Sequence, residues 1–286
     1  MIDSHARCGP DPPPLRYDSL RMPSHAIPDQ TQPQILRTYT TLHQLRSDWG
    51  GSLILSLGLD PAGAALSIAA NIAGAVSFAI DNNPTHLREV VRTGAADFVV
   101  KTLDEAIRAM KNEVRKHAPL SIALNADPFT TLTEIQDRGL APQLFSNFLS
   151  AADLTPDQAH TLTQAAHQFQ TDGALLIDFA DHTPTSPFIS SDTLLASLLN
   201  SRKWTLQTFT FDTASALRSF DAKALQLLSP EDPQETLRRR WLEAATRILQ
   251  RQRPPQRSIW LTRSEAEMLS RPEGSSTESL SSPNVP

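Results

Sequence analysis

The stretch GLDPAGAALSIAANIAGAVSFAID, residues 58–81, decides the fold. The apolar run LILSL at residues 53–57 comes directly before it, and a second apolar run occupies residues 76–80. Short apolar runs bounded by turn residues predict buried strands, and the small residues at 62–75 between them predict a helix. Strand, tight turn, helix, strand and acid, in this order, are the layout of a dinucleotide-binding unit.

Strands and helices alternate along the rest of the chain. Further strands are predicted at residues 96–100, 120–124, 144–146, 174–179, 204–211 and 258–262. Helices are predicted at residues 36–49, 84–93, 103–117, 128–138, 156–171, 194–200, 214–228 and 233–253. This alternation predicts βαβ units, and therefore an α/β fold: a Rossmann-like parallel sheet flanked by helices, with a smaller α/β portion beside it.

The two ends of the chain have a different composition from the middle. Residues 1–34 are rich in proline and lack apolar periodicity, and residues 270–286 are rich in serine and proline. Such segments cannot bury enough apolar surface to fold, so both ends are predicted to be disordered tails. One α/β domain is predicted at residues 35–269, with its Rossmann-like part at about 50–155.

Composition excludes several classes of protein. The net charge is −5 and no basic patch dominates, which gives no support to nucleic-acid binding. The single cysteine, Cys8, excludes a disulfide within the chain and a cysteine-rich zinc site. The uncharged stretch 61–80 is mostly alanine and glycine, which favours a buried helix and strand over a membrane span. We therefore expect a cytoplasmic protein that binds neither nucleic acid nor membrane.

The turn after the first strand departs from a dinucleotide-binding loop. Gly58 and Gly63 occupy the first and third glycine positions, but Asp60 occupies the second, where the backbone must approach the pyrophosphate. The Asp60 carboxylate repels phosphate, and Pro61 removes an N–H donor from the helix start. The same two residues are favoured at a helix N-cap and first helical position. We favour this structural interpretation, in which the loop keeps its fold and loses its ligand.

The acid at the end of the second strand allows two interpretations. Asp81 follows the glycine turn at about the spacing of the acid that binds the adenosine ribose in dinucleotide-binding folds. Alternatively, Asp81 and the residues Asn82, Asn83 and Pro84 form a simple turn. The sequence does not choose between them.

Three long stretches resemble the central Rossmann-like domain of urocanase (urocanate hydratase). They are GGSLILSLGLDPAGAALSIAANIAGA at 50–75, AIDNNPTHLREVVRTGAADFVVKTLDEAI at 79–107 and PLSIALNADPFTTLTEIQDRGLAPQLFSN at 119–147. The shorter stretches DGALLIDFADH, FDAKALQLL, RWLEAATRI and SIWL resemble the family in the same order. The resemblance implies a cytosolic homodimer of histidine degradation, a lyase that hydrates urocanate with tightly bound NAD⁺ as an electrophile.

The resemblance also implies a set of cofactor-binding residues. Where the family has a run like G-L-G-G-M-G-G-A-Q, this chain has GLDPAGAAL, and where it has D-Q-T-S-A-H-D, this chain has NFLSAAD. His86 stands in the place of a family arginine, and Ala126-Asp127 in the place of a Gly-Asn pair. The positions that still match, and that we predict to bind NAD⁺ if it binds, are Gly58, Gly63, Asp81, Ser150, Asp153 and Asp178.

The active-site cysteine of the family has no counterpart. The family run resembles F-C-R-G-I-G-P-F-R-W, whereas this chain has SLLNSRKW at residues 197–204. We therefore predict no catalytic residue and a degenerate urocanase-like protein without hydratase activity. Two alternatives stay open: an active NAD-dependent hydratase or lyase with a rebuilt site, and a non-catalytic module that binds a partner.

Other polar clusters carry weaker signals. His160 and His167 lie seven residues apart on one predicted helix, too far for a usual pair of metal ligands, so no metal site is predicted. Asp178, Asp181 and His182 follow a strand, either as an acid–base cluster or as loop caps. The arginine-rich helix at 235–253 is interpreted first as a solvated face and second as a surface for a protein partner.

Overall fold

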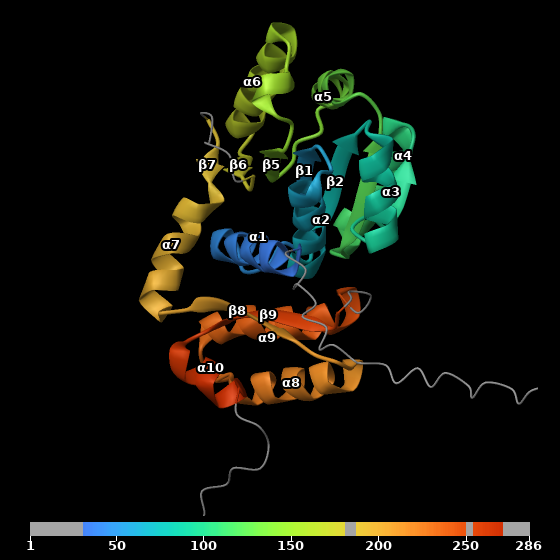
Figure 1. Cartoon of the computed structure of the whole chain (residues 1–286). Coiled ribbons are helices and arrows are strands. Elements are labelled where there is room, and N and C mark those ends of the chain that lie inside the picture. The colour runs from blue at the N-terminus through green and yellow to red at the C-terminus, as the bar shows by residue number, and fades with distance from the viewer. Residues whose placement is uncertain (1–30, 181–186, 250–253, 271–286) are drawn as a thin grey trace, which may run out of the picture.

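A computed structural model describes residues 31–180, 187–249 and 254–270, so most of the two predicted tails lies outside the described residues (Figure 1). The larger part of the molecule is a seven-stranded sheet in which every pairing is parallel. In sheet order its strands are β3 (Phe98–Val100), β4 (Leu120–Asn125), β2 (Val76–Asp81), β1 (Leu53–Leu57), β5 (Leu144–Asn147), β6 (Leu175–Asp178) and β7 (Ile189–Ser190).

Helices cover both faces of this sheet. One apolar core lies between the sheet and α1 (Thr31–Leu45), α2 (Pro61–Ala73) and α3 (Pro84–Thr93). A second core lies on the opposite face, under α4 (Leu103–Lys116), α5 (Pro128–Asp137) and α6 (Pro156–Thr171). Strands β1 and β2 are buried along their whole length, which explains their continuous apolar sequences. This three-layer arrangement confirms the predicted Rossmann-like α/β fold.

A smaller unit follows the sheet. Helix α7 (Ser191–Arg202) leads into β8 (Thr205–Thr210), which pairs antiparallel with β9 (Gln256–Leu261). Three helices surround this pair: α8 (Ala214–Leu227), α9 (Pro233–Ile248) and α10 (Arg263–Ser270). Figure 1 shows α1 between the large sheet and the smaller unit. The Trp260 indole on β9 donates to the Thr40 hydroxyl on α1 at 2.8 Å, which ties the two parts together.

The first helix starts earlier than the sequence predicts. It begins at Thr31, not at residue 36, and so includes four residues that the sequence analysis places in the disordered tail. Gln32 explains the difference, because its fully buried side chain donates to the Gln256 carbonyl and accepts from the Ser258 N–H on β9. A residue that the sequence places in the disordered tail thus makes hydrogen bonds with the backbone of a strand more than 200 positions away.

No helix in the described part of the chain is long and apolar enough to cross a membrane. The uncharged stretch 61–80 forms α2 and most of β2, and both are buried within the α/β layers.

Candidate functional site

The strand order places a candidate site between β1 and β5. After β1 the chain adds β2 beside it, then β3 at the edge of the sheet and β4 between β3 and β2. It then crosses back and continues on the other side of β1 with β5. Leu57 on β1 and Asn147 on β5 are register partners at the carboxyl ends of these two strands. Ligands of open parallel sheets bind in the crevice at such a reversal of strand order.

The two glycines of the turn at this crevice are required by the fold itself. Gly58 has φ of 90°, a left-handed conformation that side chains other than glycine rarely adopt. A Cβ atom on Gly63 would lie 2.3 Å from the Gly58 carbonyl oxygen, so only glycine lets α2 approach β1 this closely. Both residues therefore keep the structural roles that they have in a dinucleotide-binding turn.

The start of α2 is capped by a carboxylate of the chain itself. The Asp60 carboxylate accepts the Gly63 N–H at 2.8 Å and forms the N-cap, and Pro61 is the first residue of the helix. This geometry confirms the predicted capping roles of both residues. Because a helix N-terminus binds phosphate through its free N–H groups, the Asp60 carboxylate occupies a donor that a pyrophosphate would use.

The carboxylate of Asp81 is buried and fully engaged. One oxygen accepts from the Leu59 N–H at 2.6 Å and lies 2.8 Å from His86 Nδ1. The other accepts from the Asn83 N–H at 2.7 Å, as in the simple turn considered above. Asp81 therefore ties the β1–α2 turn to the start of α3, and ribose hydroxyls would compete for oxygens that already have partners.

Phe148 fills the crevice directly after β5. Its ring carbon Cδ2 would lie 3.3 Å from a Cβ on Gly63, and its own Cβ would lie 3.2 Å from a Cβ on Gly58. Its N–H donates to the Leu57 carbonyl at 2.8 Å, and its side chain is only 5% exposed. Phe148 stands in the place of a family glutamine, and the sequence does not predict that it packs against the glycine turn. Its position directly after a strand next to β1 was the available signal.

The other predicted cofactor residues lie along the same edge of the sheet. Ser150 and Asp153 are exposed in the loop after β5, where the Asp153 N–H donates to the Ser150 carbonyl at 3.0 Å. Asp178 ends β6 and accepts the Ala180 N–H at 2.8 Å. Three of the six predicted residues meet at the β1–α2 turn: Gly63 packs against Gly58, and Asp81 accepts a hydrogen bond from the Leu59 N–H of this turn. The other three lie at the ends of β5 and β6 or in the segments that follow them.

Two buried hydroxyls on the strands beside the crevice lack hydrogen bonds. Ser56 on β1 and Ser146 on β5 are register partners, and both are at most 1% exposed. Neither hydroxyl has a hydrogen-bond partner in the structure. Among the described residues, they are two buried polar groups near the crevice with unused bonding capacity.

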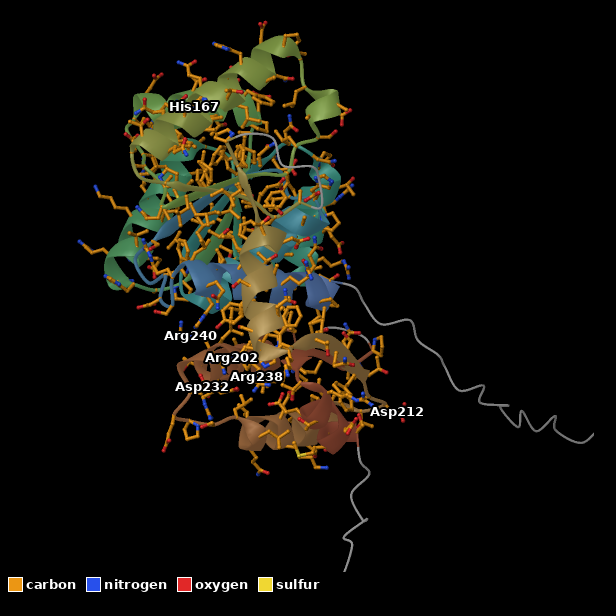
Figure 2. All side chains as sticks on the ribbon, turned by 90° about the vertical axis from the view of Figure 1, so that its left-hand side faces the viewer. His167, Arg202, Asp212, Asp232, Arg238 and Arg240 are labelled. Carbon is orange, nitrogen blue, oxygen red and sulfur yellow. The ribbon has the colours of Figure 1, made fainter. Side chains whose placement is uncertain are left out.

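The region that resembles the cysteine run of the family holds a packed cation cluster (Figure 2). The Arg238 guanidinium lies over the ring of Trp204, with 4.8 Å between the guanidinium carbon and the ring centroid. Arg238 is 3% exposed and is bonded to Glu235, Glu265 and the Trp260 carbonyl. Burial opposes ionisation of Glu265, but the bonds from Arg238 and Thr262 outweigh it and lower the pKa of the Glu265 carboxyl.

The interpretation of the arginine-rich helix as a solvated face is wrong for its first arginines. Arg238 is buried as described, Arg239 donates to the Leu228 carbonyl, and Arg240 donates to the Ser47 carbonyl. The apolar side of the same helix packs into the core through Leu237 and Trp241, and Arg238 next to Leu237 is buried with it, whereas Arg239 and Arg240 are half-exposed. Residues 250–253 of the predicted partner surface lie outside the described residues.

The histidines that the structure describes do not converge on a metal site. His160 and His167 line a shallow hollow of about 400 Å³ on α6 together with threonine and glutamine side chains. Figure 2 labels His167 on this helix. Among the residues that the structure describes, no group of three or more histidine, cysteine, aspartate or glutamate side chains is arranged to hold a metal ion. Asp181 and His182 lie outside the described residues.

Comparison with solved structures gives two partial likenesses. A short chain alcohol dehydrogenase from E. coli CFT073, complexed with NADH, is 10% identical, with a TM-score of 0.32 over 59% of this chain and 40% of that one. The alcohol dehydrogenase TADH from Thermus sp. ATN1 is 18% identical, with a TM-score of 0.30 over 57% of this chain and 39% of that one. The chain thus spans about two fifths of either dehydrogenase, and these scores carry no conclusion about function.

Comparison with protein families gives a specific match. The model of the urocanase Rossmann-like domain matches residues 31–183, which include the sheet from β1 to β6, the glycine turn, Asp81 and Phe148. The matched segment is more than half of the 286 residues. The chain therefore belongs to the urocanase family.

Proposed function

We propose that this chain is a non-catalytic member of the urocanase family that does not hydrate urocanate with NAD⁺. The observation that carries the proposal is the state of the α2 N-terminus. Asp60 accepts the Gly63 N–H there, and Phe148 packs against the same turn. A bound pyrophosphate needs both the free donor and the space, so the residues present do not fit NAD⁺.

Two further features support the loss of the reaction. The Asp81 oxygens are already bonded to Leu59, Asn83 and His86, and therefore offer little to a ribose. The segment that resembles the cysteine run of the family contains no cysteine, and Cys8 is the single cysteine of the chain. At the position of the family's active-site cysteine, the chain therefore lacks the side chain that the family resemblance implies for the reaction.

The test is to look for the cofactor directly. The full chain is purified, denatured, and the supernatant analysed for NAD⁺ by mass spectrometry, with a parallel assay of urocanate turnover. We expect no released NAD⁺ and no turnover, although circular dichroism shows a folded protein. Stoichiometric NAD⁺ would overturn the proposal, because it would mean that Asp60 and Phe148 move aside when the nucleotide binds.

An active NAD-dependent hydratase or lyase with a rebuilt site is the second candidate. The unpaired hydroxyls of Ser56 and Ser146 favour it, because they leave polar capacity on the two strands that flank the crevice. The same experiment separates the candidates, since a rebuilt site must still carry or bind NAD⁺. If it does, the double substitution S56A/S146A should lower the affinity for the cofactor.

The family resemblance also leads us to propose a homodimer. Light scattering after gel filtration should then give twice the 31.4 kDa mass of the chain. A monomer at all concentrations tested would contradict this part of the proposal.

A further inference from the structure

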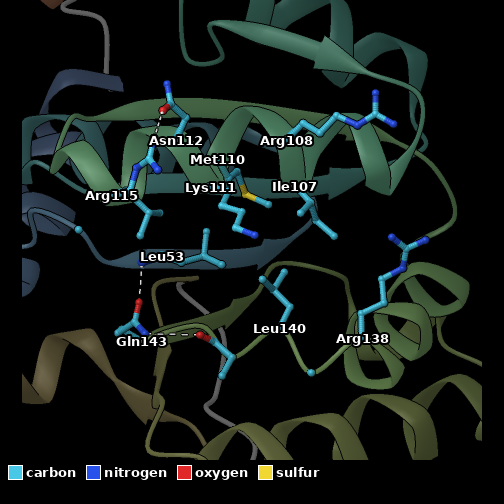
Figure 3. A pocket seen from close by; sticks show the side chains of 14 residues that line it. Leu53, Ile107, Arg108, Met110, Lys111, Asn112, Arg115, Arg138, Leu140 and Gln143 are labelled. Carbon is cyan, nitrogen blue, oxygen red and sulfur yellow. Dashed lines mark hydrogen bonds between the residues drawn. The ribbon is translucent and has the colours of Figure 1, made fainter.

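A groove lies at the end of the sheet where β1 begins, opposite the carboxyl ends of the strands, where the glycine turn lies. It has a volume of about 760 Å³ and runs between α4 and the segment that joins α5 to β5, beside the start of β1 (Figure 3). This volume is within the range of about 300–1,000 Å³ that is typical of binding pockets. The groove shares no lining residue with the crevice.

The floor of the groove is apolar and firmly held. Figure 3 shows Leu53 and Leu140 pointing into it below α4, and Ile107 and Met110 line it from the helix. The Leu53 N–H donates to the Gln143 side-chain oxygen at 2.6 Å, so the first residue of β1 and the start of β5 are fixed relative to each other. The groove is therefore preformed, which lowers the entropic cost of binding.

Among the described residues, the lining carries four cationic side chains and no carboxylate. Arg138 is neutralised by Asp104 and Glu134, which stand outside the groove. The other three cations are on α4, and in the part of the chain that the structure describes none of them forms an ion pair; they are Arg108, Lys111 and Arg115. Arg115 donates only to the amide oxygen of Asn112. The groove thus combines an apolar floor with cations that form no ion pair within the described residues, although Asp104 interacts electrostatically with Arg108.

The three cations form a row. Positions 108, 111 and 115 lie on one face of α4 because helix neighbours are three or four residues apart. The row is about 10 Å long, since each residue of a helix adds about 1.5 Å. A ligand with one carboxylate would use one of these cations, whereas a second helix with acids at the same three- and four-residue spacing would face all of them. Its apolar stripe would then face the floor.

We propose that this groove binds an acidic amphipathic helix of a partner protein. The helix would lie along α4, with leucine-type side chains over Leu53 and Leu140 and carboxylates against Lys111 and Arg115. The proposal does not depend on the nucleotide crevice, so it holds whether or not the chain binds NAD⁺.

The test uses a fluorescein-labelled synthetic peptide of about 18 residues, built from alanine with glutamates and leucines on one helical face. Fluorescence anisotropy measures its binding to the full chain. Two further peptides serve as controls: one has every glutamate changed to glutamine, and the other has every leucine changed to serine. We expect both controls to bind at least about tenfold more weakly, because the groove uses charge and apolar surface together.

Charge reversal on the protein locates the site. K111E/R115E should weaken peptide binding at least about tenfold and remove most of its dependence on salt. R88E/R218E is the matched control, because it makes the same change in charge at exposed arginines of α3 and α8 that do not line the groove. It should leave the affinity within about twofold of that of the unmodified chain.

Three results would overturn the proposal. The acidic peptide does not bind, or the serine peptide binds as well as the leucine peptide, or both protein variants weaken binding equally. In the second and third cases the attraction is general electrostatics and not the groove. Binding of a fatty acid such as dodecanoate without binding of the peptide would also overturn it, because a single carboxylate on an apolar chain would then be the preferred ligand.

Discussion

The N-cap of α2 can be tested by two substitutions that differ in one property. Asp60→Ala removes the acceptor of the Gly63 N–H, whereas Asp60→Asn keeps an acceptor in the same place without the charge. Loss of an N-cap acceptor costs about 0.5–2 kcal/mol of the free energy of unfolding. The interaction of the charge with the helix dipole contributes about 0.3–1 kcal/mol. We therefore expect D60A to lose about 1–2 kcal/mol, and D60N to lose about half of that or less.

Urea unfolding followed by circular dichroism measures this difference, provided that the slope against denaturant is unchanged. If D60A is as stable as the unmodified chain, the Asp60 carboxylate does not cap α2 in solution. The reasoning about the occupied donor would then be wrong. If D60N is as unstable as D60A, the charge and not the hydrogen bond is the important contribution.

We expect Asp60 to decide the affinity for nucleotides once the Phe148 ring no longer fills the crevice. Phe148→Ala removes the ring that packs against the glycine turn, at a cost of about 3–5 kcal/mol for a buried phenylalanine. We expect F148A alone to bind ADP-ribose poorly in calorimetry, and D60A/F148A to bind it at least about tenfold more tightly, because only the double variant frees the donor and removes the charge. Equal affinities of the two variants would refute the role given to Asp60.

Three further predictions concern stability. Gly63→Ala should prevent folding or cost more than about 3 kcal/mol in urea unfolding, because its Cβ would lie 2.3 Å from a carbonyl oxygen; unchanged stability would contradict that geometry. Arg257 and Asp221 form a buried pair at 2.8 Å, so R257M should cost about 3–5 kcal/mol, whereas R257M/D221L should recover most of it; a double variant no better than R257M would refute this. Burial, assisted by Arg240, lowers the pKa of His43 below its ordinary value of 6.5, so the unfolded chain takes up the proton first and stability falls as the pH drops below that value. H43L should flatten the fall in the free energy of unfolding between about pH 7 and 5.5. If the free energy of unfolding of H43L has the same slope against pH as that of the unmodified chain, this role of His43 is wrong.

The parts of the fold that the sequence predicts well are set by neighbours in the chain. Strands β1 and β2 agree with prediction to within one residue, because a buried run bounded by turn residues has few other structures open to it. The capping role of Asp60 and the end of α3 at Gly94 are equally local. The two-residue strand β7 was not predicted, since so short an element has no period to detect.

The errors arise where distant segments decide the outcome. Nothing in the sequence around Gln32 indicates that its amide pairs with β9, and therefore the start of α1 was placed too late. Arg238 has the sequence context of a surface cation but is buried by Glu235, Glu265 and Trp204. Such contacts depend on which elements meet in space, and short-range patterns contain no record of that.

The sequence predicts residues of the candidate site, but it does not predict the hydrogen bonds that these residues already make within the chain. Gly58 and Gly63 remain because α2 must approach β1, whether or not a nucleotide is present. The motif is therefore weak support for a ligand, and the partners of its donors and acceptors are the informative observation. Asp60 and Asp81 both have their partners within the chain, and these bonds could be found only in three dimensions.

The two ends of the parallel strands differ in whether their charged groups already have partners among the described residues. At the carboxyl end, the charged groups of the glycine turn are satisfied from within, so binding there must first break hydrogen bonds. At the opposite end of the strands, Lys111 and its two neighbouring cations are exposed beside an apolar floor, and binding there breaks no ion pair that they form within the described residues. Because the two sites share no residue, D60A should leave peptide binding unchanged, and K111E/R115E added to D60A/F148A should leave the affinity of that variant for ADP-ribose unchanged. Cross-effects between them would mean that the sheet couples its two ends, and the crevice and the groove could then no longer be treated as separate sites.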